Sequence, residues 1–333
     1  MSSLLSSATG TFPIVSGLTS ATAYSLQINA KPFSTSACSG AANPSACSGW
    51  EQFVYQESPS SVVFIEYWLL HWGTTCPSGW TTYTNPDINC YKNSSATDVT
   101  VPSLANWASF ELVGEAASGT DEVTFYDGEG NISAEGADSV LGLEGAWNAA
   151  EFNVFGNGSG SEVDFNSGTS FVVKTSLNDG TTTAPACGTE SFTAETNNLN
   201  LVGSCCPYSG SGSVLPSTQF LESNDSNATA TCGTGGVQGN FAAVPTSSGS
   251  YTTSGMEFPT ITFTEYLYDS TPGAQIYWQL PGCSGSASGF DPLSSGDSFT
   301  LVYQSQFDCN PSGTMYATAS GYLASPVTFI DFP

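Results

Sequence analysis

One carboxylate stands out because of the residues around it. In an extended strand over residues 149–155, Glu151 points to the face opposite Phe152 and Val154. Glu151 is therefore expected on the open face of a half-buried strand, next to small residues that leave room for a ligand. A carboxylate in that position can act as a general base or a general acid. Trp147 precedes the strand and is expected to offer an apolar surface for substrate binding.

An earlier strand carries a side-chain amide that could assist such a carboxylate. Over residues 50–56, alternation places Trp50, Gln52 and Gln56 on one face. An uncharged amide can donate a hydrogen bond to negative charge that develops on a reacting oxygen. Gln52 is the predicted donor, with Gln56 as the alternative, and Trp50 is expected to line the substrate site.

The most apolar stretch of the chain, residues 62–72, places Glu66 and Trp68 on one face. We expect Glu66 to bind substrate or to support the site, and Trp68 to form one wall of it. Further along, residues 163–175 are expected to form the antiparallel neighbour of the Glu151 strand.

Other catalytic chemistries lack the residues that they need. The single histidine, His71, alternates onto the face opposite Glu66, and the chain has no Gly-x-Ser-x-Gly turn, which argues against a Ser–His–Asp hydrolase. The cysteines show no Cys-x-x-Cys spacing for a metal. Residues 127–131 are rich in oxygen ligands but lack the bidentate Glu of a calcium loop, so we predict a hairpin turn there. We expect no metal and no cofactor.

The charge balance indicates an acidic medium. Aspartate and glutamate number 29, whereas the only basic side chains besides His71 are Lys31, Lys92 and Lys174, which gives a net charge of −26 at neutral pH. Once the carboxylates are protonated the charge cannot exceed about +5, so the chain would not repel itself apart in acid. Nucleic acid is excluded as a partner because no basic surface exists to neutralise phosphates.

Ten cysteines in a chain with so few lysines indicate an oxidising compartment, so we expect a secreted protein in an acidic extracellular environment. Three pairs are predicted to be local disulfides: Cys38–Cys47, Cys76–Cys90 and Cys283–Cys309. Cys232 is expected to bond Cys205 or Cys206, and Cys187 has no assigned partner. No segment is long and apolar enough to cross a membrane, and we expect a monomer.

Short alternating runs between turn clusters predict an all-β chain. We expect a flexible lead over residues 1–20, a large catalytic domain over residues 21–224, a Ser/Gly/Thr-rich linker over residues 225–257, and a small β-sandwich accessory domain over residues 258–333.

In their order along the chain, these strands resemble those of the eqolisin, or scytalidoglutamic-type, glutamic peptidases. The stretch around Gln52 is similar to the family's glutamine strand, the stretch around Glu66 to its aromatic strand, and Asn148-Ala149-Ala150-Glu151 to its glutamate strand. The segment that contains Glu195 also falls in family order. The resemblance covers roughly residues 22–224; the family's tryptophan on the strand before the glutamine has no counterpart in residues 24–29.

The resemblance implies a concanavalin-like antiparallel β-sandwich, bent and jelly-roll-like, and an acid-active endopeptidase that cleaves unfolded proteins or peptides. Glu151 would be the general base that activates water, and Gln52 would stabilise the oxyanion.

Two other classes of function remain open. The aromatic side chains of Trp50, Trp68, Trp72 and Trp147 could stack on sugar rings, with Glu66 and Glu151 as acid and base of a carbohydrate-cleaving sandwich. A non-catalytic surface or adhesion module would need none of these roles.

Overall fold

The structure of the protein is a computed structural model. The structure describes residues 4–233 apart from Ser118, Ser159, Thr189, Glu190, Ser213 and Asn227, and beyond these only the positions of further strands. The predicted all-β class is confirmed, because antiparallel strands dominate and the helices are short 3-10 turns. Among the described residues no helix is long and apolar enough to span a membrane.

The first large sheet is antiparallel and has seven strands. In spatial order they are β10 (Asn131–Gly136), β9 (Thr120–Tyr126), β8 (Glu111–Ala117), β1 (Ser7–Ser16), β13 (Ser170–Asn178), β16 (Ser217–Ser223) and β15 (Asn200–Tyr208). The predicted turn at residues 127–131 joins β9 to β10, and there Asp127 Oδ1 accepts hydrogen bonds from the backbone of Glu129 and Gly130.

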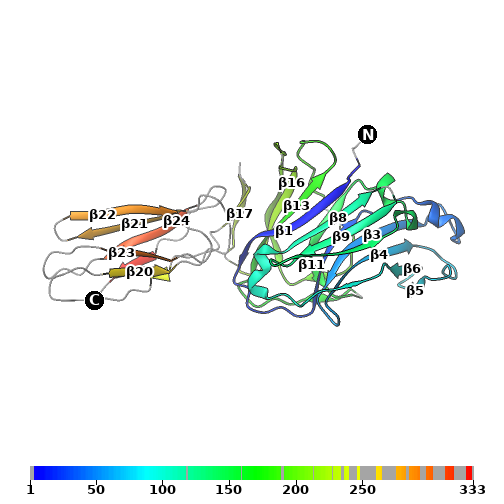
Figure 1. Ribbon diagram of the computed structural model, residues 1–333, viewed down its shortest axis with the longest axis horizontal. Coiled ribbons are helices and arrows are strands. Elements are labelled where there is room, and N and C mark those ends of the chain that lie inside the picture. The colour runs from blue at the N-terminus through cyan, green and yellow to red at the C-terminus, as the bar shows by residue number, and fades with distance from the viewer. Residues whose placement is uncertain are drawn as a thin grey trace.

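The second large sheet carries the strands of the predicted site. In order they are β11 (Ala150–Gly156), β2 (Tyr24–Ala30), β3 (Ser48–Gln56), β4 (Val62–Leu70), β6 (Ile88–Asn93) and β5 (Thr81–Thr84), with β7 (Thr97–Asp98) also paired to β4. The expected pairing of the Glu151 strand with residues 163–175 is wrong: β11 pairs with β2, and β13 lies in the other sheet between β1 and β16. Figure 1 shows the two sheets as layers.

Shorter elements complete the described fold. The 3-10 turns are η1 (Ser36–Gly40), η2 (Leu104–Ser109), η3 (Asp138–Val140) and η4 (Leu143–Gly145). Two-residue strands β12 (Glu162–Val163) and β14 (Thr196–Asn197) run parallel, and β17 (Ala230–Gly233) pairs with β18 (Gly236–Gly239). The remaining strands are β19 (Thr246–Ser247), β20 (Thr260–Thr264), β21 (Gln275–Gly282), β22 (Gly285–Pro292), β23 (Ser298–Val302), β24 (Ser312–Thr318) and β25 (Thr328–Asp331), in one three-stranded and one four-stranded sheet.

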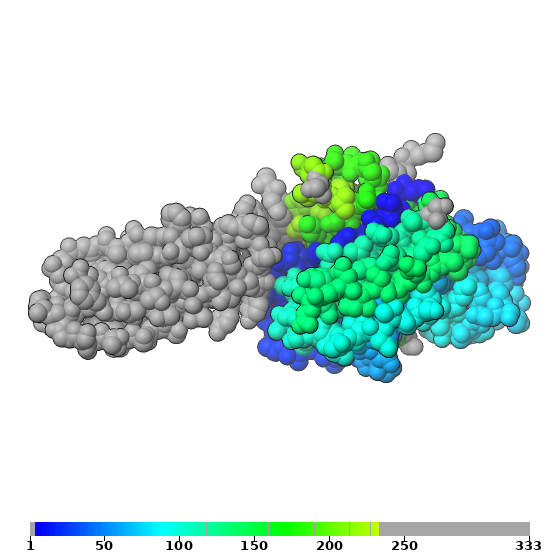
Figure 2. All heavy atoms as spheres, viewed as in Figure 1, coloured from blue at the N-terminus to red at the C-terminus, as the bar shows by residue number. Residues whose placement is uncertain are grey.

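The N-terminal segment is part of the fold, so the prediction of a flexible lead over residues 1–20 is wrong. Strand β1 lies inside the first sheet and pairs with both β8 and β13. Figure 2 shows this segment, in dark blue, as a band between other parts of the large sheets. Gly10 packs under the ring of Phe152 so closely that an added Cβ would lie 2.1 Å from a ring carbon. Small residues required by such packing weaken the hydrophobic alternation that marks a strand.

Aromatic side chains fill the space between the two sheets. Tyr55 of β3 stacks on Phe125 of β9 with ring centroids 4.0 Å apart. Trp107 of η2 is completely buried and stacks on Phe171 of β13, with centroids 5.4 Å apart. This packing defines an inner face of the second sheet, so the alternate residues of its strands lie on the opposite face.

The same core buries two carboxyl groups. Glu51 of β3 and Asp121 of β9 are both 0 % exposed, and no donor in the part of the chain that the structure describes gives either carboxyl a hydrogen bond. They lie close enough for one protonated carboxyl to donate to the other. Burial, followed by the charge of Asp121, raises the pKa of Glu51 well above its usual range. Burial and the charge of Asp138 raise the pKa of Asp121 to about 7.

Four disulfides lie in the described part of the chain. Two are the expected local pairs, Cys38–Cys47 and Cys76–Cys90. Cys232 bonds Cys206, one of its two expected partners, and Cys187 bonds Cys205. The predicted pair Cys283–Cys309 lies outside the described residues. Four disulfides are consistent with an extracellular protein.

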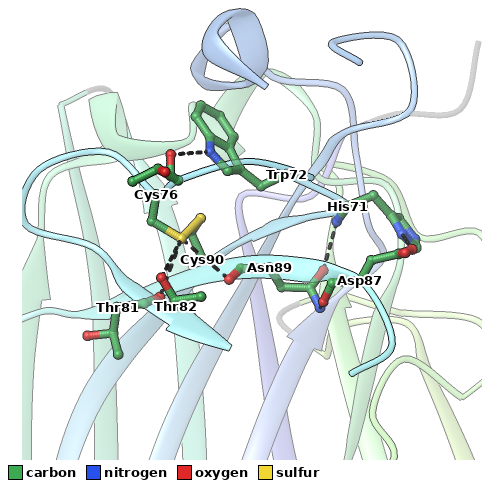
Figure 3. The surroundings of a disulfide bond; sticks show 9 residues. His71, Trp72, Cys76, Thr81, Thr82, Asp87, Asn89 and Cys90 are labelled. Carbon is green, nitrogen blue, oxygen red and sulfur yellow. Dashed lines mark hydrogen bonds and ion pairs between the residues drawn. A yellow bond between two sulfur atoms is a disulfide. The ribbon is translucent and has the colours of Figure 1, made fainter. Parts of the chain in front are cut away.

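The Cys76–Cys90 bond closes a loop next to His71, as Figure 3 shows. His71 adopts a left-handed backbone conformation with φ 54°, and its backbone N–H donates to Asn89 Oδ1 at 2.7 Å. Its ring faces Asp87 at 2.9 Å, with both side chains 59 % exposed. His71 therefore has a surface position in a turn that follows β4.

Candidate functional site

The outer face of the second sheet carries a row of polar side chains across four neighbouring strands. Register pairs Glu151 of β11 with Asn29 of β2, Asn29 with Gln52 of β3, and Gln52 with Glu66 of β4. Directly opposed residues in an antiparallel sheet point to the same face. The two predicted catalytic residues thus lie in one row with Asn29 between them.

A chain of hydrogen bonds runs along this row. Trp68 Nε1 donates to Gln52 Oε1 at 2.9 Å, and Gln52 Nε2 donates to Asn29 Oδ1 at 2.9 Å. Asn29 Nδ2 in turn donates to Glu151 Oε2 at 3.0 Å. Because an indole nitrogen can only donate, Trp68 determines which end of the Gln52 amide is the oxygen. The donor direction of the chain therefore points from Trp68 to the carboxylate of Glu151.

A second branch leads from the same amide to another carboxylate. Gln52 Nε2 also donates to Gln27 Oε1 at 2.9 Å, and Gln27 Nε2 donates to Glu195 Oε2 at 2.5 Å. Gln52, Gln27 and Asn29 are almost completely buried. Both N–H groups of Gln52 are thus engaged, and each branch ends on a glutamate.

Glu151 also accepts hydrogen bonds from a segment outside the sheet. The backbone N–H of Phe192 lies 3.3 and 3.2 Å from its two carboxyl oxygens. Burial raises the pKa of Glu151, while Asn29, the Phe192 backbone and the Ser191 side chain oppose that rise. These donors favour the ionised form that a general base requires.

Two further glutamates on this face have raised pKa values. Burial raises the pKa of Glu66 to about 7, with Trp68 opposing the rise and the charge of Glu195 adding to it. Burial also raises the pKa of Glu195, while Gln27 and the backbone of Gly158 oppose it. A protonated Glu66 would be available as an acid in mildly acidic solution.

A fourth glutamate lies beside β11, the strand at the edge of the second sheet. Glu222 of β16 accepts hydrogen bonds from Asn153 at 2.7 Å and from Asn197 at 3.2 Å. Burial raises its pKa to about 7, against the effect of both amides. Asn197 also donates to the Val154 backbone, so this cluster attaches the segment around Glu195 to strand β11.

The predicted aromatic residues fall into two groups. Trp50 and Trp68 lie on the polar face with ring centroids 6.0 Å apart, and Trp68 stacks on Tyr91 at 5.0 Å. Trp147 is 1 % exposed and packs against Phe53 in the core, so it lies on the other side of the sheet from Gln52.

The structure also distinguishes between the two glutamines on β3. Gln52 is buried inside the hydrogen-bond chain, whereas Gln56 Nε2 donates to the Ser60 backbone at 3.4 Å near a turn. Gln27 and Asn29 were not predicted as site residues. Their signal is present in the sequence, because both alternate with Leu26 and Ile28 and place amides on one face of a strand.

Within the residues that the structure describes, no group of three histidine, cysteine or acidic side chains could hold a metal ion. The chain matches no protein-family model and no curated protein.

Proposed function

We propose that the chain is a secreted, acid-active endopeptidase in which Glu151 and Gln52 hydrolyse peptide bonds. The observation that carries this proposal is the row Glu151–Asn29–Gln52, in which a carboxylate and an uncharged amide are joined through one buried side chain. The proposal needs no histidine, covalent intermediate or metal ion.

In the proposed reaction, ionised Glu151 takes a proton from water, and the water oxygen attacks the scissile carbonyl carbon. Negative charge then develops on the carbonyl oxygen. Gln52 Nε2 would donate to that oxygen by exchanging one of its two bonds, to Gln27 or Asn29, for a bond to the charged oxygen. The exchange is favourable because hydrogen bonds to charged acceptors are stronger than those between neutral groups. Protonated Glu151 then gives its proton to the departing amine.

Other groups on the face would contact the substrate. Trp68 and Tyr91 present stacked rings that are each partly exposed. Trp50 packs beside them, with its ring centroid 6.0 Å from that of Trp68. Glu66 would support this wall in its protonated form.

The finer assignments of fold and organisation belong to the same proposal. We infer a concanavalin-like, bent jelly-roll sandwich for the two large sheets, consistent with their antiparallel pairing and shared aromatic core. The eqolisin resemblance, the linker over residues 225–257 and the accessory domain over residues 258–333 remain predictions.

A carbohydrate-active sandwich is the second candidate, favoured by the aromatic cluster around Trp68. Its acid and base would be Glu66 and Glu151. These residues are three strands apart in one row, which separates their backbones by roughly 14 Å. Glycosidase carboxyl groups lie about 5–10 Å apart, so both side chains would have to lean toward each other. The peptidase needs no such approach.

Digestion of casein between pH 2 and pH 7 tests the proposal. We expect cleavage in acid that chelators and pepstatin do not inhibit. Glu151→Gln should lower kcat/KM by roughly 100-fold or more, and Gln52→Ala by a similar factor. Gln56→Ala, on the same face of the same strand, is the matched control and should retain activity. Cleavage that survives in Glu151→Gln would contradict the mechanism, and no cleavage at any pH would favour the carbohydrate candidate.

A further inference from the structure

Asn29 lies between the two proposed catalytic residues, Glu151 and Gln52. It is 0 % exposed, and its strand β2 lies between the strands of Glu151 and Gln52. Its register partner is Glu151 on one side and Gln52 on the other. Both polar atoms of its side chain are used: Oδ1 accepts from Gln52 and Nδ2 donates to Glu151.

The orientation of this amide is determined from both ends. Trp68 fixes the Gln52 amide so that Nε2 faces Asn29. A reversed Asn29 would place its NH₂ group against that NH₂ group, and its oxygen against the carboxylate of Glu151. Both contacts would be repulsive in a buried setting, where unsatisfied polar groups are costly. Asn29 therefore has one favourable orientation.

We propose that Asn29 is a positioning residue that couples Gln52 to Glu151, holding the amide in place and stabilising the carboxylate. This inference rests on the proposed function for its catalytic meaning, but the coupling itself is a property of the hydrogen bonds. An N–H donor to a buried carboxylate favours the charged form. Loss of Asn29 should therefore make Glu151 harder to ionise.

The other acidic groups around Glu151 cannot supply this stabilisation. On the same face the other carboxyl groups are those of Glu66, Glu195 and Glu222, and the phenols of Tyr83 and Tyr91 pack on Trp68, so none of these titratable groups is a cation. Lys31 follows β2 and is exposed. Among the residues that the structure describes, the other donors to Glu151 are the Phe192 backbone and the Ser191 side chain.

Two substitutions separate positioning from mere packing. Asn29→Ala removes both bonds. Asn29→Asp keeps the shape: its neutral carboxyl can accept from Gln52 and donate to Glu151, whereas its ionised form cannot donate. Asn153→Ala is the matched control, because it removes an amide from the strand of Glu151 that bonds Glu222 instead.

Titration of Glu151 by carbon-13 NMR gives a readout that does not depend on peptidase activity. In protein labelled at the glutamate carboxyl carbons, the Glu151 signal is the one missing from Glu151→Gln. We expect its pKa to rise by about one unit in Asn29→Ala and by more in Asn29→Asp, and to stay unchanged in Asn153→Ala. The acid limb of casein cleavage should move upward with the pKa of Glu151 in both Asn29 variants, and should stay in place in Asn153→Ala.

An unchanged Glu151 titration in folded Asn29→Ala and Asn29→Asp, judged by near-ultraviolet circular dichroism, would overturn the proposal. If Asn29→Ala does not fold, the isosteric Asn29→Asp decides alone. If the wild type cleaves nothing at any pH, the peptidase fails, while the shift of the Glu151 titration still supports or refutes the coupling.

Discussion

The polar face of the second sheet and the core between the sheets both bury glutamates, but only the polar face supplies them with amide donors. Glu151, Glu195 and Glu222 each accept from asparagine or glutamine side chains. Glu51 in the core faces Asp121, another carboxyl. Burial raises the pKa in both regions, and amides oppose it only on the polar face.

The difference shows that the partners of a buried carboxyl, rather than its burial, determine what it can do. An amide leaves the carboxylate able to ionise and to accept a proton from water. Two carboxyls without other donors must share a proton, because two negative charges in contact are unfavourable in a low-dielectric core. The polar face is therefore suited to acid–base chemistry, whereas we expect the core pair to make the fold more stable in acid.

The largest expected effect is the loss of stability as the pH rises. The groups that face Glu51 and Asp121 are Tyr67, Asp138 and Glu144, none of which is a cation. Because the pair has raised pKa values in the folded protein, the unfolded chain releases its protons first. The stability present at low pH is therefore lost from about pH 4 upward through about pH 7. We expect the melting temperature to fall by on the order of 10 °C between pH 4 and pH 7.5.

Glu51→Gln combined with Asp121→Asn should flatten this dependence, because the paired amides no longer titrate. Glu115→Gln removes a carboxyl from the exposed side of β8 and is the matched control, with the slope retained. Thermal unfolding followed by circular dichroism across the pH range gives the comparison. A melting temperature that increased steadily from pH 3 to pH 8 would contradict the role of the core pair.

Glu222 should show a smaller effect, because amides surround it. In Glu222→Gln one acceptor oxygen becomes an NH₂ group that faces the NH₂ group of Asn153 or Asn197. Asn197 cannot simply turn, since its oxygen accepts from the Leu199 backbone. We expect a loss of about 1–3 kcal/mol in the free energy of unfolding, measured with denaturant at pH 8, where Glu222 is ionised and both of its oxygens are acceptors. A stabilised Glu222→Gln would mean that the amides do not compensate for burial on this face.

Trp68→Phe tests the start of the hydrogen-bond chain. A smaller aromatic ring replaces the indole and has no N–H, so Gln52 Oε1 loses its donor and the Gln52 amide is less firmly oriented. We expect a cost of about 0.5–1.5 kcal/mol in unfolding free energy and about a tenfold decrease in kcat with casein. Tyr83→Phe is the control, because it keeps a ring packed against Trp68 and leaves the hydrogen bond from Trp68 to Gln52 in place. Equal kcat values for Trp68→Phe and the control would show that Trp68 is not needed to orient the Gln52 amide.

Alternation alone predicted which residues of each strand share a face. It placed Gln52 with Trp50, Glu66 with Trp68, and Glu151 opposite Phe152, because a strand has a period of two. It could not predict which strands are neighbours. Asn29 and Glu151 are far apart in the sequence, and their pairing depends on how the chain returns to the sheet. The importance of Asn29 and Gln27 follows from that pairing, so they were missed.

Close packing hid other features from the sequence. Gly10 belongs to a central strand because the Phe152 ring covers it, and no local pattern indicates such a contact. Trp147 was expected near the substrate because of its position in the sequence, but the turn before β11 directs it into the core against Phe53. Glu51 was visible as the residue opposite Gln52 in the alternation, and only the facing sheet reveals Asp121 as its neighbour.

The smallest effect is expected where a charged pair is exposed to water. His71 and Asp87 lie 2.9 Å apart at the surface, and each is 59 % exposed. Water screens such a pair, so its net contribution to stability is about 0–1 kcal/mol. Asp87→Asn should therefore change the unfolding free energy by less than about 1 kcal/mol. A larger loss, measured by denaturant unfolding against the wild type, would show that the Cys76–Cys90 loop depends on this pair, and that burial is not what separates strong from weak carboxyl contacts in this protein.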